Sequence, residues 1–224
     1  MSQVHRVQTV SECYSLSFDD GPDPNLTPRL LDHLRQFQAR ATFFVIGEKA
    51  IRHPDLIKCI VEQGHEIGNH SYSHPYMLKL SDGELLRQID RTQYAVFDAC
   101  GRWPTLFRAP HGRMKKHQRT MLEFNRQIKC CYWSLDPKDW RDQDAAIIAS
   151  RIVGEVRRGD IVLTHDVLET SVNGVQDALQ AIEASDLQSI PISELMQLGE
   201  VITEPEEGRS DFEPLSSISA GTSF

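Results

Sequence analysis

Short apolar segments alternate with amphipathic helical segments along most of this chain, from about residue 12 to about residue 199. Leu26, Leu30, Leu31 and Leu34 recur at helical spacing, and the next segment, residues 41–46, is an unbroken apolar run of strand length. Strands that alternate with helices in this way pair in parallel, and the helices then cover the resulting sheet. The alternation, repeated about seven times, therefore predicts an α/β fold, a distorted (β/α)7-type barrel of parallel strands ringed by helices.

The expected elements follow one another with short connections. Strands are predicted at residues 14–18, 41–46, 66–69, 105–108, 129–135, 160–164 and 188–192. Helices are predicted at residues 25–38, 55–63, 81–99, 116–124, 145–157 and 174–184, with Asn25 as an N-cap and Gly64 ending the second helix. Ser81 and Glu84 have the spacing of a capping box. The 224 residues therefore divide into an N-terminal arm (1–11), one barrel domain (12–199) and a flexible C-terminal tail (200–224).

Composition and charge restrict the partners. The net charge of −8 argues against a broad nucleic-acid surface, which needs a basic face, so no nucleic-acid partner is expected.

No window of the sequence approaches the ~20 apolar residues of a membrane span. Residues 1–12 contain no signal-peptide pattern, which predicts a cytoplasmic protein, or an extracellular or periplasmic one if a leader has been removed. The five cysteines are scattered along the chain, which predicts reduced thiols. No pattern in the sequence predicts an oligomeric state.

Polar clusters follow five of the predicted strands. They are residues 19–20, 70–75, 108–112, 136–140 and 163–166. In a parallel α/β barrel the active site is built from the loops that follow the strands. We therefore expect these five clusters to converge on one pocket.

Two of the clusters suggest a metal site. Asp19 and Asp20 are adjacent, and because like charges repel, one of them resists ionisation unless a cation lies near. His70 and His74 are spaced i, i+4, so one turn of helix would put both imidazoles on one face, close to a single cation. Three protein ligands with an open position describe a catalytic metal site. The alternatives are an Asp pair that caps a turn and a polar loop with two solvated histidines.

These motifs, in this order, resemble those of the polysaccharide deacetylases of carbohydrate esterase family 4, the NodB-homology group. The matching segments are Ser-Phe-Asp-Asp-Gly-Pro (17–22), His-Ser-Tyr-Ser-His-Pro (70–75), Arg-Ala-Pro-His-Gly (108–112), Asp-Pro-Lys-Asp-Trp (136–140) and Leu-Thr-His (163–165). Each motif alone is weak evidence, but their combined order and spacing are specific. The resemblance covers the barrel pattern as a whole.

The resemblance implies a divalent metal held by Asp20, His70 and His74. Zinc is the expected ion, with cobalt or another divalent metal as alternatives, because a ligand set of oxygen and imidazole accepts several ions. Asp19 is implied as the general base that takes a proton from the attacking water. Arg108 is implied to orient Asp19 and keep it ionised, and the alternative is an ordinary surface ion pair.

The resemblance also implies a general acid and a substrate pocket. His165 would protonate the departing amine, and Asp139 would favour the charged ring of His165. Trp140 and Leu163 would form walls for the acetyl methyl group, and His111 replaces the tyrosine that the family often has at this place. The alternatives are a capping role for Asp139 and plain core positions for Trp140 and His165.

The function implied is the metal-dependent removal of N-acetyl groups from glycans that contain N-acetylglucosamine, so the partner is an acetylated oligo- or polysaccharide. One alternative is an acetyl esterase acting on acetylated xylan. A second is a ring-opening amidohydrolase acting on cyclic ureides or imides. A third is a carbohydrate-binding module that kept the fold and lost the chemistry, although such a protein should have lost Asp19 or His165.

Overall fold

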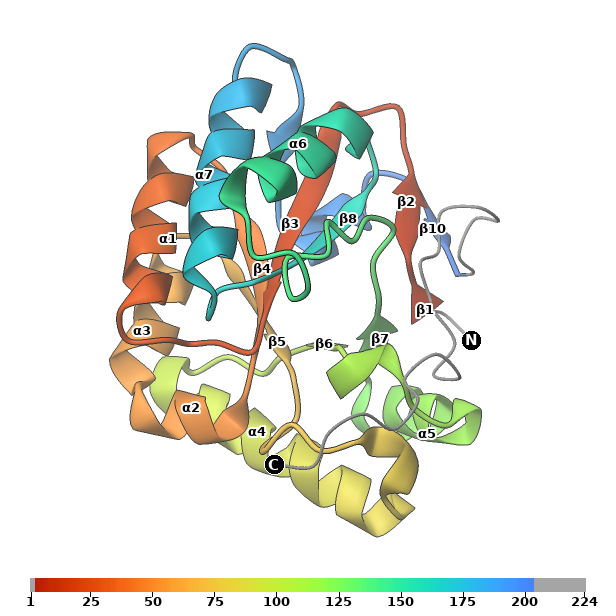
Figure 1. The fold of residues 1–224 in the computed structure, drawn as a ribbon. Coiled ribbons are helices and arrows are strands. Elements are labelled where there is room, and N and C mark those ends of the chain that lie inside the picture. Colours follow the sequence, from red (N-terminus) through yellow and green to blue (C-terminus); the bar gives the residue numbers. More distant parts are fainter. Residues whose placement is uncertain (1–2, 204–224) are drawn as a thin grey trace, which may run out of the picture.

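The computed structural model describes residues 3–203 and builds them around one sheet of eight strands, all paired in parallel (Figure 1). The strand order is β1-β7-β6-β5-β4-β3-β8, and β9 pairs with β3. The strands are β1 (Gln3–Val4), β3 (Cys13–Asp19), β4 (Ala41–Val45), β5 (Glu66–Asn69), β6 (Leu106–Phe107), β7 (Lys129–Cys131), β8 (Ile161–His165) and β9 (Gln188–Ser189). Two further strands, β2 (Arg6–Gln8) and β10 (Glu200–Ile202), pair antiparallel.

The sheet curls into an incomplete barrel. Among residues 3–203, no ladder joins β8 to β7 or β1, and single bridges span the gap, between Leu135 and Val162 and between Arg6 and Asp160. The predicted distorted barrel of parallel strands is therefore confirmed.

Helices follow the strands and cover the sheet. They are α1 (Leu26–Gln36), α2 (Gly47–Arg52), α3 (Pro54–Glu62), α4 (Asp82–Cys100), α5 (Lys116–Arg126), α6 (Ala145–Glu155), α7 (Glu169–Ile182) and α8 (Ile192–Leu195), with 3-10 turns at Met77–Lys79 and Pro110–Gly112. Helix α7 packs against α1 and α6, and α4 packs against α2 and α3 (Figure 1). Their buried faces form the largest core cluster with the side chains of β3 and β4.

A second apolar cluster joins the strands to α8. Val4, Phe44, Leu106 and Cys131 come from four different strands and pack with Ile192 of α8. All five side chains are almost completely buried. Burying apolar surface contributes a free energy of roughly 25 cal/mol per Å². This burial stabilises the short strands, which form few ladder hydrogen bonds of their own.

The local signals at the helix ends are mostly confirmed. Ser81 and Glu84 form the predicted capping box at the start of α4. Gly64 follows α3 with φ +83°, a conformation that glycine adopts without steric penalty. Asn25 is at the N-cap position of α1, but its side chain makes no capping bond. The Oδ1 of Asp23 accepts instead from the backbone N–H groups of Asn25 and Leu26.

Short strands lie within both segments that were expected to flank the barrel. The expected arm (1–11) contains β1, which pairs with β7, and Val4 is completely buried. The expected tail (200–224) begins with β10, which pairs with β2, while residues 204–224 lie outside the described part of the chain. Strands of two or three residues are too short to display an alternating pattern, so the sequence could not reveal them. Helix α2 was missed for the same reason.

Candidate active site

The five polar clusters lie where their strands end, at one edge of the sheet. Asp19 is the last residue of β3, and it is in register with His165, the last residue of β8. His70 follows β5 directly, and Arg108 follows β6. The contacts below join these residues, so the predicted convergence on one site is confirmed by the geometry.

Asp20, His70 and His74 form the candidate metal centre. One ligand atom from each lies within 4.8 Å of the others. The Nε2 atoms of His70 and His74 are 3.4 and 3.2 Å from Oδ1 of Asp20. The Nδ1 of His70 donates to the carbonyl oxygen of Arg108 at 2.8 Å, which leaves Nε2 directed at Asp20. Such a bond from the other ring nitrogen is typical of metal-binding histidines.

The donor set fits a divalent cation. Oδ1 of Asp20 is buried, and the ring nitrogens of His70 and His74 are the polar side-chain atoms that the structure places beside it. Burial alone would raise the pKa of Asp20, but the neighbouring His70 and His74 hold that pKa well below its usual range. Burial and the adjacent His70 lower the pKa of His74 to about 4, so its ring is neutral at physiological pH. A carboxylate and a neutral imidazole are the forms that bind metal.

The prediction that a turn of helix carries both histidines was wrong. Residues 70–76 form a loop, in which Ser71 and His74 have φ values of 67° and 56°. Non-glycine residues rarely adopt this left-handed conformation, and such outliers cluster at functional sites. Side-chain hydrogen bonds hold the loop, since Oδ1 of Asn69 accepts from the N–H of Ser71 and the hydroxyl of Ser71 accepts from the N–H of His74.

Asp19 and Arg108 form a buried ion pair beside this centre. Arg108 is completely buried, and its Nη1 donates to Oδ1 of Asp19 at 2.9 Å and to the Ser17 hydroxyl at 2.8 Å. Its Nη2 donates to the carbonyl oxygen of Tyr132, and its guanidinium lies 4.1 Å from the ring centroid of Phe44. These contacts exclude the alternative of a surface ion pair and hold the carboxylate in one orientation.

Asp139 and His165 form a second pair. Asp139 is completely buried, and it accepts from Nδ1 of His165 at 2.9 Å, from the N–H of His165 at 2.8 Å and from the Ser171 hydroxyl at 2.6 Å. Burial by itself would lower the pKa of His165, but the hydrogen bond and charge of Asp139 outweigh it and raise that pKa to about 9. The bond to Nδ1 leaves Nε2 as the nitrogen that can deliver a proton. Since the carboxylate of Asp139 is bound by His165 and Ser171, the alternative that Asp139 merely caps the following segment is wrong.

His111 lies on the rim of the candidate metal centre. It has φ 57°, and its ring stacks on Tyr76 at 4.0 Å between centroids with an angle of 12° between planes. It also meets His74 edge-on at 4.7 Å. Tyr76 is 54% exposed, so the stacked pair presents an aromatic surface to solvent next to the histidine loop.

The two expected wall residues differ in exposure. Leu163 is buried in β8, whereas the ring of Trp140 is half exposed, and its Nε1 donates to Asp136 at 3.4 Å. The alternative that Trp140 is plain core is therefore wrong. The shared role of Trp140 and Leu163 as walls for the acetyl methyl group stays a prediction.

Several residues that support the site were given no role in the sequence analysis. Ser17 and Ser171 bond Arg108 and Asp139 respectively, and both belong to ordinary-looking strand and helix segments. Asp166 is completely buried, its carboxylate accepts from the Thr27 hydroxyl, and burial raises its pKa to about 7. A Cβ built on Gly21 would lie 2.3 Å from both Asp166 carboxylate oxygens, so the glycine next to Asp20 is required by this packing.

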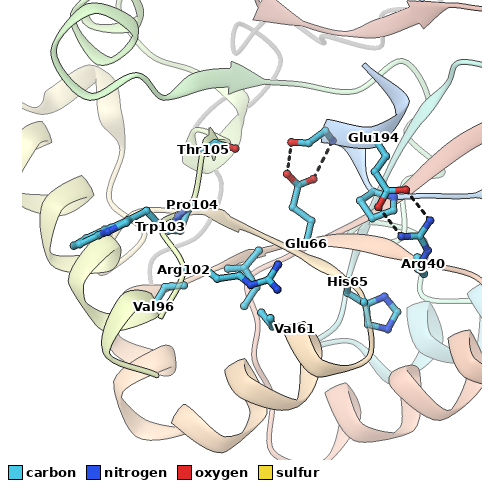
Figure 2. Close-up of a pocket in the computed structure, with 14 residues that line it drawn as sticks. Arg40, Val61, His65, Glu66, Val96, Arg102, Trp103, Pro104, Thr105 and Glu194 are labelled. Carbon is cyan, nitrogen blue, oxygen red and sulfur yellow. Dashed lines mark hydrogen bonds and ion pairs between the residues drawn. The ribbon is translucent and has the colours of Figure 1, made fainter. Parts of the chain in front are cut away.

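A separate hollow of about 400 Å³ lies at the opposite edge of the sheet, among residues that precede β4, β5 and β6 (Figure 2). Arg40 donates two hydrogen bonds to Glu194, and the Glu66 carboxylate accepts from Thr42 and Ser193. Arg40 and Glu194 therefore bind each other, and Glu66 is bound by neutral donors. The amino-end face of an α/β barrel generally serves stability, so this hollow has no part in the candidate active site.

Fold and site together define a parallel α/β barrel protein with a candidate divalent-metal centre and two flanking acid–base pairs at the carboxyl ends of its strands. The chain belongs to the polysaccharide deacetylase family, whose sequence model matches residues 6–128. The resemblance inferred from the five motifs is thereby confirmed.

Known relatives extend the match beyond residue 128. The chain is 34% identical over 199 residues to the peptidoglycan-N-acetylglucosamine deacetylase PgdA of Listeria monocytogenes, an alignment that covers 87% of this chain and 42% of that protein. It is 37% identical over 164 residues to a chitooligosaccharide deacetylase of Sinorhizobium fredii, covering 73% and 76% of the two chains. The structure of peptidoglycan deacetylase PdaC from Bacillus subtilis superimposes with a TM-score of 0.81 at 32% identity, covering 86% and 93%. This chain thus spans less than half the length of PgdA.

Proposed function

We propose that this protein is a divalent-metal-dependent hydrolase that removes N-acetyl groups from glycans containing N-acetylglucosamine. One observation carries the proposal: a three-residue set that could hold a metal ion lies at the same edge of the sheet as a buried carboxylate–arginine pair and a carboxylate–histidine pair. Amide hydrolysis needs a base on one side of the reacting carbon and an acid on the other. The names of the relatives support the substrate class, since they include deacetylases of peptidoglycan and of chitooligosaccharides.

Asp20, His70 and His74 would hold the cation, and zinc is the ion that two imidazoles and one carboxylate suit best. When bound, a divalent cation polarises the amide carbonyl and acidifies water. The described part of the site has no further His, Cys, Asp or Glu grouped with these three. A set of three leaves coordination positions open for water and substrate.

Asp19 would act as the general base. Its Oδ1 is bound by Arg108, while its Oδ2 lies 3.7 Å from Nε2 of His70, on the side of the metal centre. The oxygen next to the centre is the one that can take a proton from the attacking water. Arg108 fixes the direction of that carboxylate, because its guanidinium is itself held by Ser17 and Tyr132.

His165 would act as the general acid. Its Nδ1 is bound to Asp139, so Nε2 carries the proton that passes to the departing amine nitrogen. The raised pKa of His165 keeps the ring charged at neutral pH until the C–N bond breaks. A bound cation adds positive charge nearby and would lower that pKa towards neutrality, which favours proton delivery.

Product analysis by mass spectrometry tests the proposal. Chitotetraose, acetylated xylan and a hydantoin-type ring are each incubated with the protein, with chelator alone and after zinc or cobalt is added back. We expect loss of acetyl groups and appearance of free amines on chitotetraose, only with metal. Acetate from xylan alone would favour the esterase, and ring opening alone would favour the amidohydrolase. Binding of chitotetraose without turnover in the presence of metal would favour a binding module.

No helix within residues 3–203 has the length and apolar character to cross a membrane. The five cysteines are free thiols in the described structure, as predicted. The cellular compartment stays a prediction.

A further inference from the structure

The hollow of about 400 Å³ at the amino ends of β4, β5 and β6 has an aromatic wall. Trp103 lines it from the segment between α4 and β6 (Figure 2). The ring of Trp103 stacks on Phe97 of α4, with 4.3 Å between centroids and an angle of 13° between planes, and it meets Tyr94 edge-on at 5.4 Å. Two neighbouring rings therefore hold the indole in one orientation.

The three rings are accessible from solvent. Trp103 is 47% exposed, Tyr94 is 61% exposed and Phe97 is 37% exposed. Large apolar groups that gather on a surface mark interaction sites, whereas singly exposed ones are ordinary. A rigid, half-exposed indole beside a hollow offers an apolar platform, and its N–H adds a hydrogen-bond donor.

The charged groups of the lining balance one another in sign. They are Arg40, Arg102, Glu66 and Glu194. Arg40 and Glu194 are joined by two hydrogen bonds. Arg102 forms no ion pair or hydrogen bond within the part of the chain that the structure describes, and it is exposed. Its side chain extends into the hollow from the segment that carries Trp103, so its guanidinium is available to a ligand (Figure 2).

Acceptors lie in the same hollow. The carboxylate of Glu66 accepts from the Thr42 hydroxyl, from the N–H of Ser193 and from the Ser193 hydroxyl. A carboxylate has about four acceptor positions, so three donors leave one of them. Thr105 also lines the hollow and is exposed, and its hydroxyl can both donate and accept. The lining thus combines a guanidinium, a carboxylate and a hydroxyl with an aromatic wall.

A neutral sugar suits this combination better than a charged ligand does. The C–H faces of a pyranose are apolar and pack on an indole, while its hydroxyl groups both donate and accept hydrogen bonds. The carboxylate of Glu66 would repel an anion, and the guanidinium of Arg102 would repel a cation. The volume of the hollow lies within the range of about 300–1,000 Å³ that is usual for small-ligand sites.

We infer that this hollow is a second carbohydrate-binding site, which takes a neutral pyranose unit of a glycan. The sugar ring would pack on Trp103, and Arg102, Glu66 and Thr105 would bind its hydroxyl groups. The site lies at the opposite edge of the sheet from the candidate metal centre, so it would anchor the protein on a glycan without taking part in hydrolysis. Two attachment points on one polymer bind more tightly than either does alone. The inference takes its ligand class from the proposed function, but none of its residues belongs to the chemistry.

An NMR titration of chelated protein with chitotetraose tests the site in the absence of metal-dependent turnover. The chain has three tryptophans and hence three indole N–H signals, and Trp103→Phe identifies the signal of the hollow. We expect this signal to shift saturably. Arg102→Gln should weaken the binding that the Trp103 signal reports by roughly tenfold, because it removes a charge-assisted hydrogen bond. Arg52→Gln is the matched control, since Arg52 is exposed and outside the lining, and it should leave the titration unchanged.

Retention on amorphous chitin supplies a second measurement. Trp103→Ala should lower the retained fraction of chelated protein severalfold, because it removes the platform of one of two attachment points. Phe124→Ala is the control, since it removes a ring that is 77% exposed on α5, and it should be retained like wild type.

Three results would overturn the inference: a Trp103 signal that does not move at about 10 mM chitotetraose, equal titrations of wild type and Arg102→Gln, or a signal that shifts with protein concentration alone. The last would mark a contact between copies of the chain. Hydrolysis of chitotetraose with an unmoved Trp103 signal would sink the inference and keep the proposed function. A saturable shift in a protein that hydrolyses nothing after zinc is added would support the inference and refute the proposed function.

Discussion

The Asp139–His165 pair offers the most quantitative prediction. Burial would lower the pKa of His165, but the hydrogen bond and charge of Asp139, followed by the charges of Asp19 and Asp20, raise that pKa from 6.5 to about 9. That rise corresponds to about 3 kcal/mol of preference for the charged ring, since each pH unit is worth about 1.4 kcal/mol. In Asp139→Asn the charge is removed while the shape remains, so we expect the pKa of His165 to fall to 6.5 or below, and at about pH 7.5 no more than roughly a tenth of the rings would stay protonated.

Two measurements would detect the lower pKa of His165 in Asp139→Asn. NMR titration of the histidine rings, carried out on chelated protein with His165→Gln for assignment, should show one midpoint moving from the alkaline range to below neutrality. In the metal-loaded protein, the falling limb of kcat against pH should move to lower pH, because that limb reports the loss of the general acid.

The pair should also make stability depend on pH. The pKa of His165 is higher in the folded state than its ordinary value, so its contribution to the unfolding free energy is complete below about pH 6.5 and is lost as the pH rises through about 9. In urea titrations of chelated protein, the advantage of wild type over Asp139→Asn should therefore shrink by about 3 kcal/mol between about pH 6 and about pH 10.

Ser171→Ala is the control, because it removes a neutral donor to Asp139 and keeps the carboxylate. The His165 midpoint should stay well above that of the Asn variant. Equal His165 midpoints in wild type and Asp139→Asn would refute the electrostatic reasoning.

Three other changes test the rest of the site. Asp19→Asn should keep bound metal but lower turnover by roughly 10²–10⁴-fold, measured by mass spectrometry beside metal analysis, and wild-type rates would remove Asp19 as the base. His70→Ala should lose stoichiometric zinc in elemental analysis after desalting, and retention of one zinc per chain would exclude His70 from the ligands. Gly21→Ala places a Cβ 2.3 Å from the Asp166 carboxylate oxygens, so the unfolding free energy in urea should fall by about 1–3 kcal/mol, and an unchanged midpoint would contradict that packing.

Much of the fold could be predicted because its signals are local. Apolar runs and helical periodicity occupy contiguous segments, and most of the predicted elements recur within a few residues of their observed bounds. The failures came where an element was too short to show a pattern. β1, β10 and α2 owe their conformation to pairing and packing with distant segments.

The convergence of the polar clusters and a candidate metal site could be proposed from the residues at strand ends, because parallel strands end at one edge of the sheet. Both acid–base pairs could be proposed only because the five motifs resemble those of a known family. Only the tertiary structure decided how they are held. It placed His70 and His74 in a loop with left-handed residues, buried Arg108 against Phe44 and paired Asp139 with Ser171. It also grouped Glu66 with Arg102, which are remote in the chain. Burial, orientation and pKa depend on neighbours brought together by folding, and such neighbours leave no periodic trace in the order of residues.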